Sequence, residues 1–342
     1  TAIAALAALL GALKVTGKKI DEIKIVMNGA GAAGTAIARL LLEDGVKPEN
    51  MTILNSKGIL YDNGKRDRVQ LELIHKTNPE NKQGTFAEAV KGADVLIGCS
   101  APGVFNNDAI KTMADKSIVF AMANPVPEIM EEEAKEKGVY IYGSGRSDMH
   151  NQVNNSSVFP GLFRGALDVR ARQINEEMKL AAVRAIAGLA KKPVPDVVNE
   201  AYHVNNLSFG PEYFIPKPVD PRLITEVSMA VAKAAMDSGV ARKQITDWEG
   251  YKNHLRELMG QENKLTRQLY ETARRNPQRV VFAEGIHPNM LKAAVEAKAE
   301  GICHPIILGN DEAIEKLAKE LDLSLEGIEI VNLRHPDEAP RR

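Results

Sequence analysis

The segment Gly29-Ala30-Gly31-Ala32-Ala33-Gly34 constrains the fold of this chain more than any other, because it joins an apolar run to a helical one. Residues 23–27 have the composition of a buried strand, and residues 35–43 have helical periodicity. In such a unit the first glycine permits a tight turn, the second lets the backbone approach a pyrophosphate, and the third lets the helix pack on the strand. The phosphates would meet the free N–H groups at the start of the helix. The pattern predicts a dinucleotide site, with a purely structural glycine turn as the alternative.

Residues 21–142 alternate short apolar runs with helical ones, which is typical of βαβ units around a parallel sheet. Strands are predicted at residues 23–27, 51–54, 95–99, 118–121 and 139–142, and helices at 35–43, 86–91, 107–114 and 128–137. The predicted fold is therefore α/β, a doubly wound Rossmann-type parallel sheet whose ligand lies outside the carboxyl ends of the strands.

The end of the second predicted strand indicates which dinucleotide is preferred. An acidic residue about twenty residues after the glycine loop would bind the ribose 2′-hydroxyl of NAD. This chain has Asn55-Ser56-Lys57-Gly58 there, with no carboxylate to repel a 2′-phosphate and an ammonium group nearby. The turn favours NADP, NAD remaining possible, and a solvated turn with an incidental lysine is the alternative.

Three later loops carry polar groups that could contact a ligand. The segment containing Ser100 follows the strand predicted at 95–99, Ala123-Asn124-Pro125 follows the strand at 118–121, and Asn151-Gln152-Val153-Asn154-Asn155 lies beyond the strand at 139–142. Amides donate and accept hydrogen bonds without adding charge, which suits a carboxylate or a nicotinamide carboxamide. Taken singly, Asn-Pro is usually a turn and an asparagine-rich segment is usually a surface loop.

The charge balance excludes one class of partner. Lys plus Arg is 44 and Asp plus Glu is 45, so no basic excess is present to bind nucleic acid. Cys99 and Cys303 each lie in an apolar segment, which suits buried thiols in a reducing compartment better than a disulfide. These features predict a cytoplasmic protein.

The apolar opening of the chain is too short to cross a bilayer and has no basic residues before it. Ile3, Leu6, Leu10 and Leu13 recur at helical spacing, which predicts a packed helix and no membrane partner. Because the chain starts inside this pattern without an initiator Met, we expect a further segment before Thr1.

No metal site is predicted from this chain alone. The histidines show no paired ligand spacing, and Asp148 stands alone in its loop. Glu131-Glu132-Glu133 is a charge run on a predicted helix, so a solvated face is expected.

Beyond the sheet, helices are predicted at residues 175–190 and 225–238, joined by a proline-rich stretch that favours extended backbone. A polar helix at residues 247–260 precedes a second α/β pattern, with strands at 280–283, 305–308 and 328–331 and helices at 289–300 and 312–321. We predict a nucleotide-binding domain at 1–247, a helical linker at 248–276 and part of a second domain at 277–342.

Several of these loops, taken in order, resemble malic enzymes. The resemblance rests on Thr1-Ala2-Ile3-Ala4, the glycine loop, Ser56-Lys57-Gly58, Ala123-Asn124-Pro125, the segment 151–155, the segment 159–168, the segment 207–213 and Ile215-Pro216-Lys217-Pro218. It covers residues 1 to about 247 and is strongest to the long bacterial NADP-dependent form.

The resemblance implies oxidative decarboxylation of L-malate to pyruvate and carbon dioxide, with NADP as oxidant and Mg²⁺ or Mn²⁺ as Lewis acid. Asn124 and Asn155 match family residues that hold the substrate carboxylate and the nicotinamide. The family's catalytic Tyr and Lys and its metal carboxylates match no residue here, so we expect them before Thr1. A homo-oligomer is also implied.

The last part of the chain resembles phosphate acetyltransferases. The resemblance rests on Arg279-Val280-Val281-Phe282-Ala283-Glu284-Gly285 and Pro305-Ile306-Ile307-Leu308-Gly309-Asn310. It implies a fused domain that could bind acetyl-CoA as an effector. Three strands leave a sheet with an unpaired edge, so we expect the complete domain to be longer.

Two other functions stay open at this point. The chain could be a non-catalytic nucleotide or acyl-CoA binding module, or another Rossmann dehydrogenase that acts on an amino acid. The second is disfavoured because no carboxylate in these loops is placed to meet a substrate ammonium.

Overall fold

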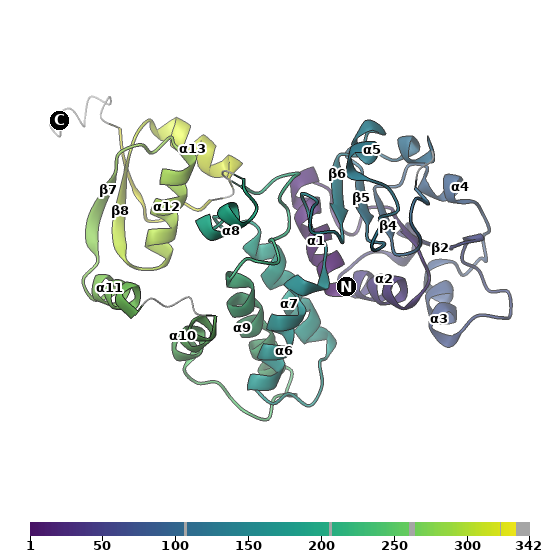
Figure 1. Cartoon of the computed structure of the whole chain (residues 1–342), viewed down its shortest axis with the longest axis horizontal. Coiled ribbons are helices and arrows are strands. Elements are labelled where there is room, and N and C mark those ends of the chain that lie inside the picture. The colour runs from purple at the N-terminus through teal and green to yellow at the C-terminus, as the bar shows by residue number, and fades with distance from the viewer. Residues whose placement is uncertain (106–107, 205–206, 260–263, 322, 333–342) are drawn as a thin grey trace. The chain divides into compact units, whose positions relative to one another are not determined.

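The computed structural model describes residues 1–105, 108–204, 207–259, 264–321 and 323–332. The chain divides into two compact units, Thr1–Trp248 and Glu249–Arg342, each built round its own sheet (Figure 1).

The sheet of the first unit has the strand order β3-β2-β1-β4-β5-β6. Its strands are β1 (Ile25–Asn28), β2 (Met51–Asn55), β3 (Gly58–Ile59), β4 (Val95–Gly98), β5 (Ile118–Ala121) and β6 (Ile141–Ser144). All neighbours pair in parallel except β2 and β3, which form an antiparallel hairpin. The order reverses between β1 and β4, which is where a doubly wound sheet opens a crevice at its carboxyl edge. The predicted fold class is confirmed.

Strands β1, β4, β5 and β6 are buried along their whole length, as parallel strands covered on both faces should be. The segments that connect the strands form α2 (Ala32–Glu43), η1 (Pro48–Asn50), α3 (Arg68–Thr77), α4 (Phe86–Val90), η2 (Asp108–Thr112) and α5 (Glu131–Glu136). One core cluster joins strand residues such as Val26, Leu96 and Val119 to Phe105 and Ile129 from the loops.

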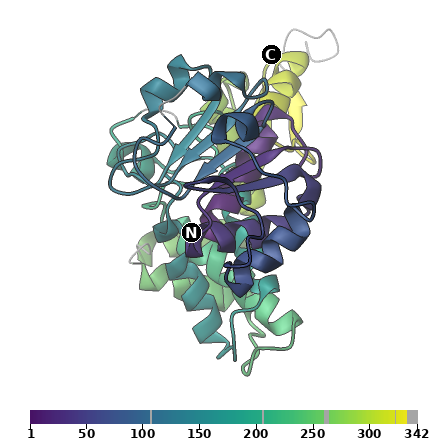
Figure 2. The ribbon, with the colours of Figure 1, turned by 90° about the vertical axis from the view of Figure 1, so that its right-hand side faces the viewer.

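A helical group completes the first unit and lies below the strands in Figure 2. It comprises η3 (Asn155–Ser157), α6 (Phe159–Asp168), α7 (Glu176–Leu189), α8 (Asp196–Ala201) and α9 (Arg222–Asp237). Helices α6 and α9 pack closely because α6 has glycines at the contact: a Cβ on Gly161 would lie 2.6 Å from Val227 Cβ, and one on Gly165 would lie 2.5 Å from the Ser228 carbonyl oxygen.

The opening helix α1 (Ala2–Thr16) is buried on nearly every side and packs against α2 and α7. The predicted helix is confirmed, although its buried surface is wider than the stripe that the spacing indicated. Within the described residues, none of the helices has both the length and the apolar character needed to cross a membrane.

The second unit contains a three-stranded parallel sheet of order β7-β8-β9. Its elements are α11 (Lys264–Arg275), β7 (Gln278–Phe282), α12 (Pro288–Ala299), β8 (Cys303–Leu308), α13 (Asp311–Glu320) and β9 (Glu329–Val331), and α10 (Trp248–Leu258) begins at the boundary between the units. Leu291, Ile307 and Ile314 form the centre of its core. Four of the five residues of β7 are exposed.

Several predicted boundaries were wrong. Helix α2 begins at Ala32 and not at residue 35, because Gly31 takes extended backbone angles and serves as its N-cap. Helix α5 begins at Glu131 and not at 128, because Glu128 is buried in the preceding loop. Strand β6 begins two residues later than predicted, at Ile141.

Other elements were missed or changed in type. The predicted helix at 107–114 is the short 3₁₀ helix η2. Asn107, the first residue of that prediction, lies outside the described residues, and so does Gly260, the last residue of the helix predicted at 247–260. The proline-rich stretch predicted as extended contains α8. Helix α3, whose N-cap Asp67 accepts a hydrogen bond from the Gln70 N–H, and helix α6 were not predicted as helices.

Candidate functional site

The glycine loop lies at the carboxyl end of β1, beside the end of β4. Gly29 has a φ of 125°, and a Cβ there would lie 2.6 Å from the Cys99 carbonyl oxygen. Gly34 is in the first turn of α2, where a Cβ would lie 1.8 Å from the Gly29 carbonyl oxygen. A Cβ on Gly31 would meet nothing within 4 Å. Two glycines are therefore required by packing, and the third faces open space at a helix N-terminus.

The open side of this loop has the features of a phosphate site. Ala32 and Ala33 are exposed and stand in the first turn of α2, whose leading N–H groups have no partner within a helix. Helix α3 fixes the backbone at Ala30, because the Gln70 Nε2 amide donates to the Ala30 carbonyl oxygen at 3.1 Å. The loop is thus fixed by its neighbours before any ligand binds.

The turn between β2 and β3 places the residues predicted to select the dinucleotide. Asn55 Oδ1 accepts the Lys57 N–H at 2.8 Å, and this local bond shapes the turn. Gly58 has a φ of 113° and packs against the Gly84 carbonyl oxygen, where a Cβ would be 2.2 Å away. The Ser56 and Lys57 side chains are exposed. The hairpin presents an ammonium group and a hydroxyl beyond the end of β2.

The loop after β4 is fixed by two side chains from other segments. The Asn28 Nδ2 amide donates to Ser100 Oγ at 3.3 Å, and the Ser100 N–H donates to Glu128 Oε1 at 3.0 Å. Burial and the nearby Glu128 charge raise the pKa of Cys99 to about 12, so this thiol stays neutral at physiological pH. Cys99 therefore packs as an apolar group and is not a nucleophile.

The loop after β5 carries Asn124 on the surface and Glu128 beneath it. Asn124 is exposed, whereas Glu128 is fully buried. Glu128 Oε2 accepts the Ala123 N–H at 2.9 Å. Burial raises the pKa of Glu128, and the N–H groups of Ser100 and Ala123 oppose that shift.

The loop after β6 separates the asparagines that the sequence grouped together. Asn151 is buried, and its side chain bonds to the backbone of Tyr142, Pro211 and Phe214. Asn154 is bonded to Gly145 and Ser156. Asn155 is exposed at the start of η3, and its side chain forms no hydrogen bond with another described residue. Asn155 is thus the asparagine of this segment that is available to a ligand.

Arg146 connects this loop to the preceding one. Its Nη1 donates to the Pro125 carbonyl oxygen at 3.2 Å, while Nε and Nη2 bind the two Asp148 carboxylate oxygens at 2.8 and 2.6 Å. The hydrogen bonds from the Arg146 guanidinium lower the pKa of Asp148. Asp148 is therefore paired and not a vacant metal ligand.

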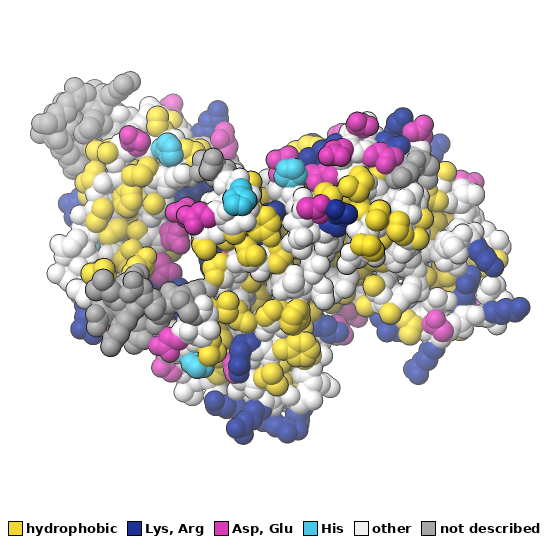
Figure 3. All heavy atoms as spheres, in the orientation of Figure 1, with side chains coloured by type: hydrophobic (Ala, Val, Ile, Leu, Met, Phe, Trp, Pro, Cys, Tyr) yellow, Lys and Arg dark blue, Asp and Glu magenta, His cyan; other side chains and the backbone are white. Residues whose placement is uncertain are grey.

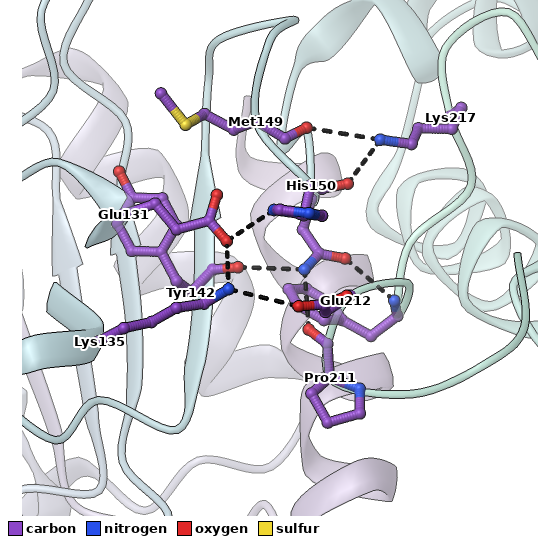
Figure 4. A network of polar contacts seen from close by, with 10 residues as sticks. Glu131, Lys135, Tyr142, Met149, His150, Pro211, Glu212 and Lys217 are labelled. Atoms are coloured by element: carbon purple, nitrogen blue, oxygen red, sulfur yellow. Dashed lines mark hydrogen bonds and ion pairs between the residues drawn. The ribbon is translucent and has the colours of Figure 1, made fainter. Parts of the chain in front are cut away.

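A polar network behind the β6 loop joins it to α5 and to the segment after α8 (Figure 4). Glu131 Oε1 accepts from His150 Nδ1 at 2.9 Å and pairs with Lys135 Nζ at 2.9 Å, and Lys135 also reaches Glu212 at 3.4 Å. The predicted solvated face at residues 131–133 was therefore wrong for Glu131, which is only 8% exposed. The network thus links the β6 loop to α5.

Lys217, in the segment after α8, also holds the β6 loop in place. Its Nζ donates to the His150 carbonyl oxygen at 2.6 Å (Figure 4). The same nitrogen lies 4.3 Å from the centroid of the Tyr202 ring. Burial lowers the pKa of Lys217 to about 8. The ammonium thus stabilises the loop backbone and is not exposed to solvent.

The residues predicted for the site follow the carboxyl ends of β1, β2, β4, β5 and β6, so the sheet gathers them at one edge. Three residues that fix these loops were missed: Asn28, Gln70 and Glu128. Asn28 donates to the Ser100 hydroxyl, Gln70 donates to the Ala30 carbonyl oxygen, and Glu128 accepts the Ser100 N–H, all across long sequence separations. Only the glutamate directly after Pro127 was visible as an unusual charge in an apolar loop.

The described residues do not fit a divalent metal by themselves. In that part of the chain no three His, Cys, Asp or Glu side chains come together as a ligand group. His150 is engaged with Glu131. His335 lies outside the described residues. We therefore assign no chemical step in this chain to a metal ion.

The strand order, with a glycine turn at the switch point between β1 and β4, defines a Rossmann-type domain. A family model described as the malic enzyme NAD binding domain matches residues 1–209. The chain belongs to the malic enzyme family. A second model, described as phosphate acetyl/butaryl transferase, matches residues 264–340.

Individual relatives agree with both matches. The chain is 44% identical over 336 residues to the NADP-dependent malic enzyme of Salmonella typhimurium, covering 97% of this chain and 44% of that protein. The malic enzyme structure from Pyrococcus horikoshii matches with a TM-score of 0.66 at 44% identity, covering 76% of this chain and 58% of that one. The Entamoeba histolytica malic enzyme matches with a TM-score of 0.67 at 33% identity, covering 94% and 59%. The chain thus spans less than half the length of the Salmonella relative.

Proposed function

We propose that the protein to which this chain belongs oxidises L-malate with NADP and decarboxylates the product to pyruvate and carbon dioxide. The observation that carries the proposal is the open space beside Gly31 at the N-terminus of α2. The exposed amides of Asn124 and Asn155 lie in loops at the same edge of the sheet. Membership of the malic enzyme family supports the reaction class.

NADP is the proposed oxidant because the Asn55-Ser56-Lys57 turn offers a cation and no carboxylate to the 2′-phosphate. Gly29, Ala30, Gly31, Ala32, Ala33 and Gly34 would hold the pyrophosphate through backbone groups. Ser100 would lie beside the nicotinamide, since it follows β4 next to the glycine loop. The name of the Salmonella relative is consistent with this preference.

Asn124 and Asn155 are proposed to bind the substrate carboxylate and the nicotinamide amide. Both are exposed at loops whose backbones are fixed by Glu128, Arg146 and Asn154. An amide held on a rigid loop binds a carboxylate at a low entropic cost. The general base and acid, and the carboxylates that would hold Mg²⁺ or Mn²⁺, are proposed to come from residues outside this chain.

The proposed domain limits are 1–247 for the nucleotide-binding domain, 248–276 for the linker and 277–342 for part of an acetyltransferase-like domain. The match of residues 264–340 to phosphate acetyl/butaryl transferases supports the last of these. Regulation by acetyl-CoA at that domain, a homo-oligomeric assembly and a cytoplasmic location complete the proposal.

The test is malate-dependent NADPH production by the full-length protein with Mn²⁺, compared with NADH production from NAD. Asn155→Ala should lower kcat/KM for malate about tenfold to a hundredfold, since a hydrogen bond to a charged group is lost. Asn124→Ala should have a larger effect if it contacts both ligands. Asn50→Ala, at the amino end of β2, is the matched control and should leave the kinetics unchanged.

Two results would count against the proposal. A full-length protein that binds NADP without turning over malate would favour a nucleotide-binding module. Unchanged kinetics in Asn155→Ala would remove that residue from the site.

A further inference from the structure

Glu128 touches two of the loops that are proposed to bind cofactor and substrate. Its Oε1 accepts the Ser100 N–H at 3.0 Å, and its Oε2 accepts the Ala123 N–H at 2.9 Å. Ser100 belongs to the loop after β4, and Ala123 directly precedes Asn124 in the loop after β5. One carboxylate therefore sets the spacing between the two loops.

The surroundings of Glu128 are shaped to admit its side chain. Gly98, the last residue of β4, leaves the space that the carboxylate fills, because a Cβ there would lie 2.5 Å from the Glu128 carboxyl carbon. The backbone reinforces the contact: the Phe105 N–H donates to the Glu128 carbonyl oxygen at 3.0 Å, and the Gly103 N–H donates to that of Pro127 at 3.2 Å. The β4 loop thus wraps round residues 127 and 128.

The partners of this carboxylate differ from those of Glu131, which lies three residues later. Glu131 is paired with Lys135 and His150. Within the described residues Glu128 forms no ion pair, and its side chain accepts hydrogen bonds from backbone N–H groups. A buried carboxylate is costly, and an apolar side chain would fill the same space at lower cost. Such a side chain could not accept the two N–H groups at once.

We propose that Glu128 is a positioning residue, which holds the Ser100 and Asn124 loops at the separation needed for hydride transfer between substrate and nicotinamide. It contacts neither reactant and acts through the two loops. The inference rests on the proposed function, since it assumes that these loops bind the nicotinamide and the substrate.

The experiment compares Glu128→Gln and Gly98→Ala in the full-length protein. An amide can accept only one of the two N–H groups and turns its own NH₂ toward the other, so one loop is released. Gly98→Ala keeps the carboxylate, but the added methyl group would displace it from its position beside β4. Glu132→Gln, which changes an exposed carboxylate on α5, is the matched control.

Both variants should raise the Kd for NADP and lower kcat/KM for malate about tenfold to a hundredfold, with the control unchanged. Malate deuterated at C2 should show a larger isotope effect on kcat/KM in the variants, because a misplaced nicotinamide slows hydride transfer itself. Thermal unfolding measured alongside gives the folded fraction at the assay temperature.

The proposal is overturned if Glu128→Gln keeps kcat/KM within about twofold of the wild type. It is also overturned if activity falls only with the folded fraction and the isotope effect stays constant, because that describes a structural role alone.

Failure of the proposed function is distinguishable from failure of this inference. If the wild type does not turn over malate, the function is wrong, and amide hydrogen exchange then decides the role of Glu128. Exchange in residues 98–105 and 122–128 should accelerate together in Glu128→Gln. Acceleration in one segment alone would show that the carboxylate does not couple the loops.

Discussion

In each unit of this chain the first strand is followed by a glycine-bearing loop and a helix, but the space around the glycine differs. A Cβ on Gly31, between β1 and α2, would meet nothing within 4 Å. A Cβ on Gly285, between β7 and α12, would lie 2.2 Å from Ile307 Cγ2 and 2.8 Å from the Leu308 carbonyl oxygen. The space beside the loop glycine is therefore open to a phosphate in the first unit, whereas core residues fill it in the second.

The strands that lead into these loops differ as well. All of β1 is buried, whereas β7 has exposed apolar side chains such as Val281, which is 55% exposed. Figure 3 shows hydrophobic side chains gathered over β7 and β8 of the second unit. Parallel strands are usually covered on both faces. Within the described residues β1 has this cover and β7 does not, so substitutions in the two strands should have different effects on stability.

The largest effect is expected for Gly34→Ala in the first unit. Its Cβ would stand 1.8 Å from the Gly29 carbonyl oxygen, so the backbone of the loop must move. We expect a loss of about 3 kcal/mol in the free energy of unfolding and an NADP affinity at least about a hundredfold lower. Chemical denaturation and calorimetric titration measure the two quantities.

The counterpart in the second unit is Gly285→Ala, which sharpens the comparison. It should destabilise the second unit through the contact with Ile307 and leave the Kd for NADP unchanged. A weaker NADP affinity in this variant would break the distinction between the open and the filled loop.

A smaller effect, confined to one cofactor, is expected for Lys57→Ala. Losing a charge-assisted contact to the 2′-phosphate should cost about 1.5–3 kcal/mol of NADP affinity while the Kd for NAD stays the same. Lys65→Ala, which removes another exposed lysine of the same unit, provides the control. Equal affinities for NADP and NAD in the wild type would disprove the preference.

The sheet and the glycine loop were predictable because their signals are local. Strand β5 was predicted without error, since Ile118–Ala121 is an uninterrupted apolar run that begins directly after the polar Ser117. The start of α2 was not, because the helix extends back to Ala32 through a glycine that local propensity disfavours. Whether Gly34 stands before or inside a helix depends on packing against Gly29, which a sequence pattern does not reveal.

The parts of the site that were missed depend on contacts between distant segments. Glu128 resembles a helix-start residue in sequence, and only the fold brings Ser100 to it across the sheet edge. Glu131 lies in a run of three glutamates that indicated a solvated face, yet it is buried, where Lys135 pairs with it and His150 lies within hydrogen-bond distance. Charge runs predict exposure only when no later segment returns to pair with them.

A moderate effect, limited to binding, is expected for Gly31→Ala. Gly31 has a φ of -84° and a ψ of -170°, which an alanine adopts easily, and its Cβ would face open space. The free energy of unfolding without ligand should change by less than about 0.5 kcal/mol. The NADP affinity should fall about tenfold, because the methyl group would occupy the approach of the pyrophosphate.

The pair Gly31→Ala and Gly34→Ala therefore separates the two roles of glycine within one loop. Denaturation curves without NADP should distinguish them clearly, while titrations with NADP should show weaker binding in both. If Gly31→Ala bound NADP as the wild type does, the open space would not be the phosphate site.

The smallest effect is expected for Val281→Thr on β7, matched with Val119→Thr on β5. The two substitutions exchange the same methyl group for a hydroxyl in a parallel strand. Val119 is fully buried, so its variant must desolvate a hydroxyl and should lose about 1–3 kcal/mol in the free energy of unfolding. At Val281 the hydroxyl can remain hydrated, and the loss in this chain should stay below about 0.5 kcal/mol. Repeating both measurements in the full-length protein tests whether β7 is covered there: a cost at Val281 that rises toward the Val119 value would show that other residues of the protein pack on this strand. A loss in free energy of unfolding at Val281 that stays near zero would show that β7 is exposed in the full-length protein too. The contrast between β7 and β5 would then be a property of the whole molecule.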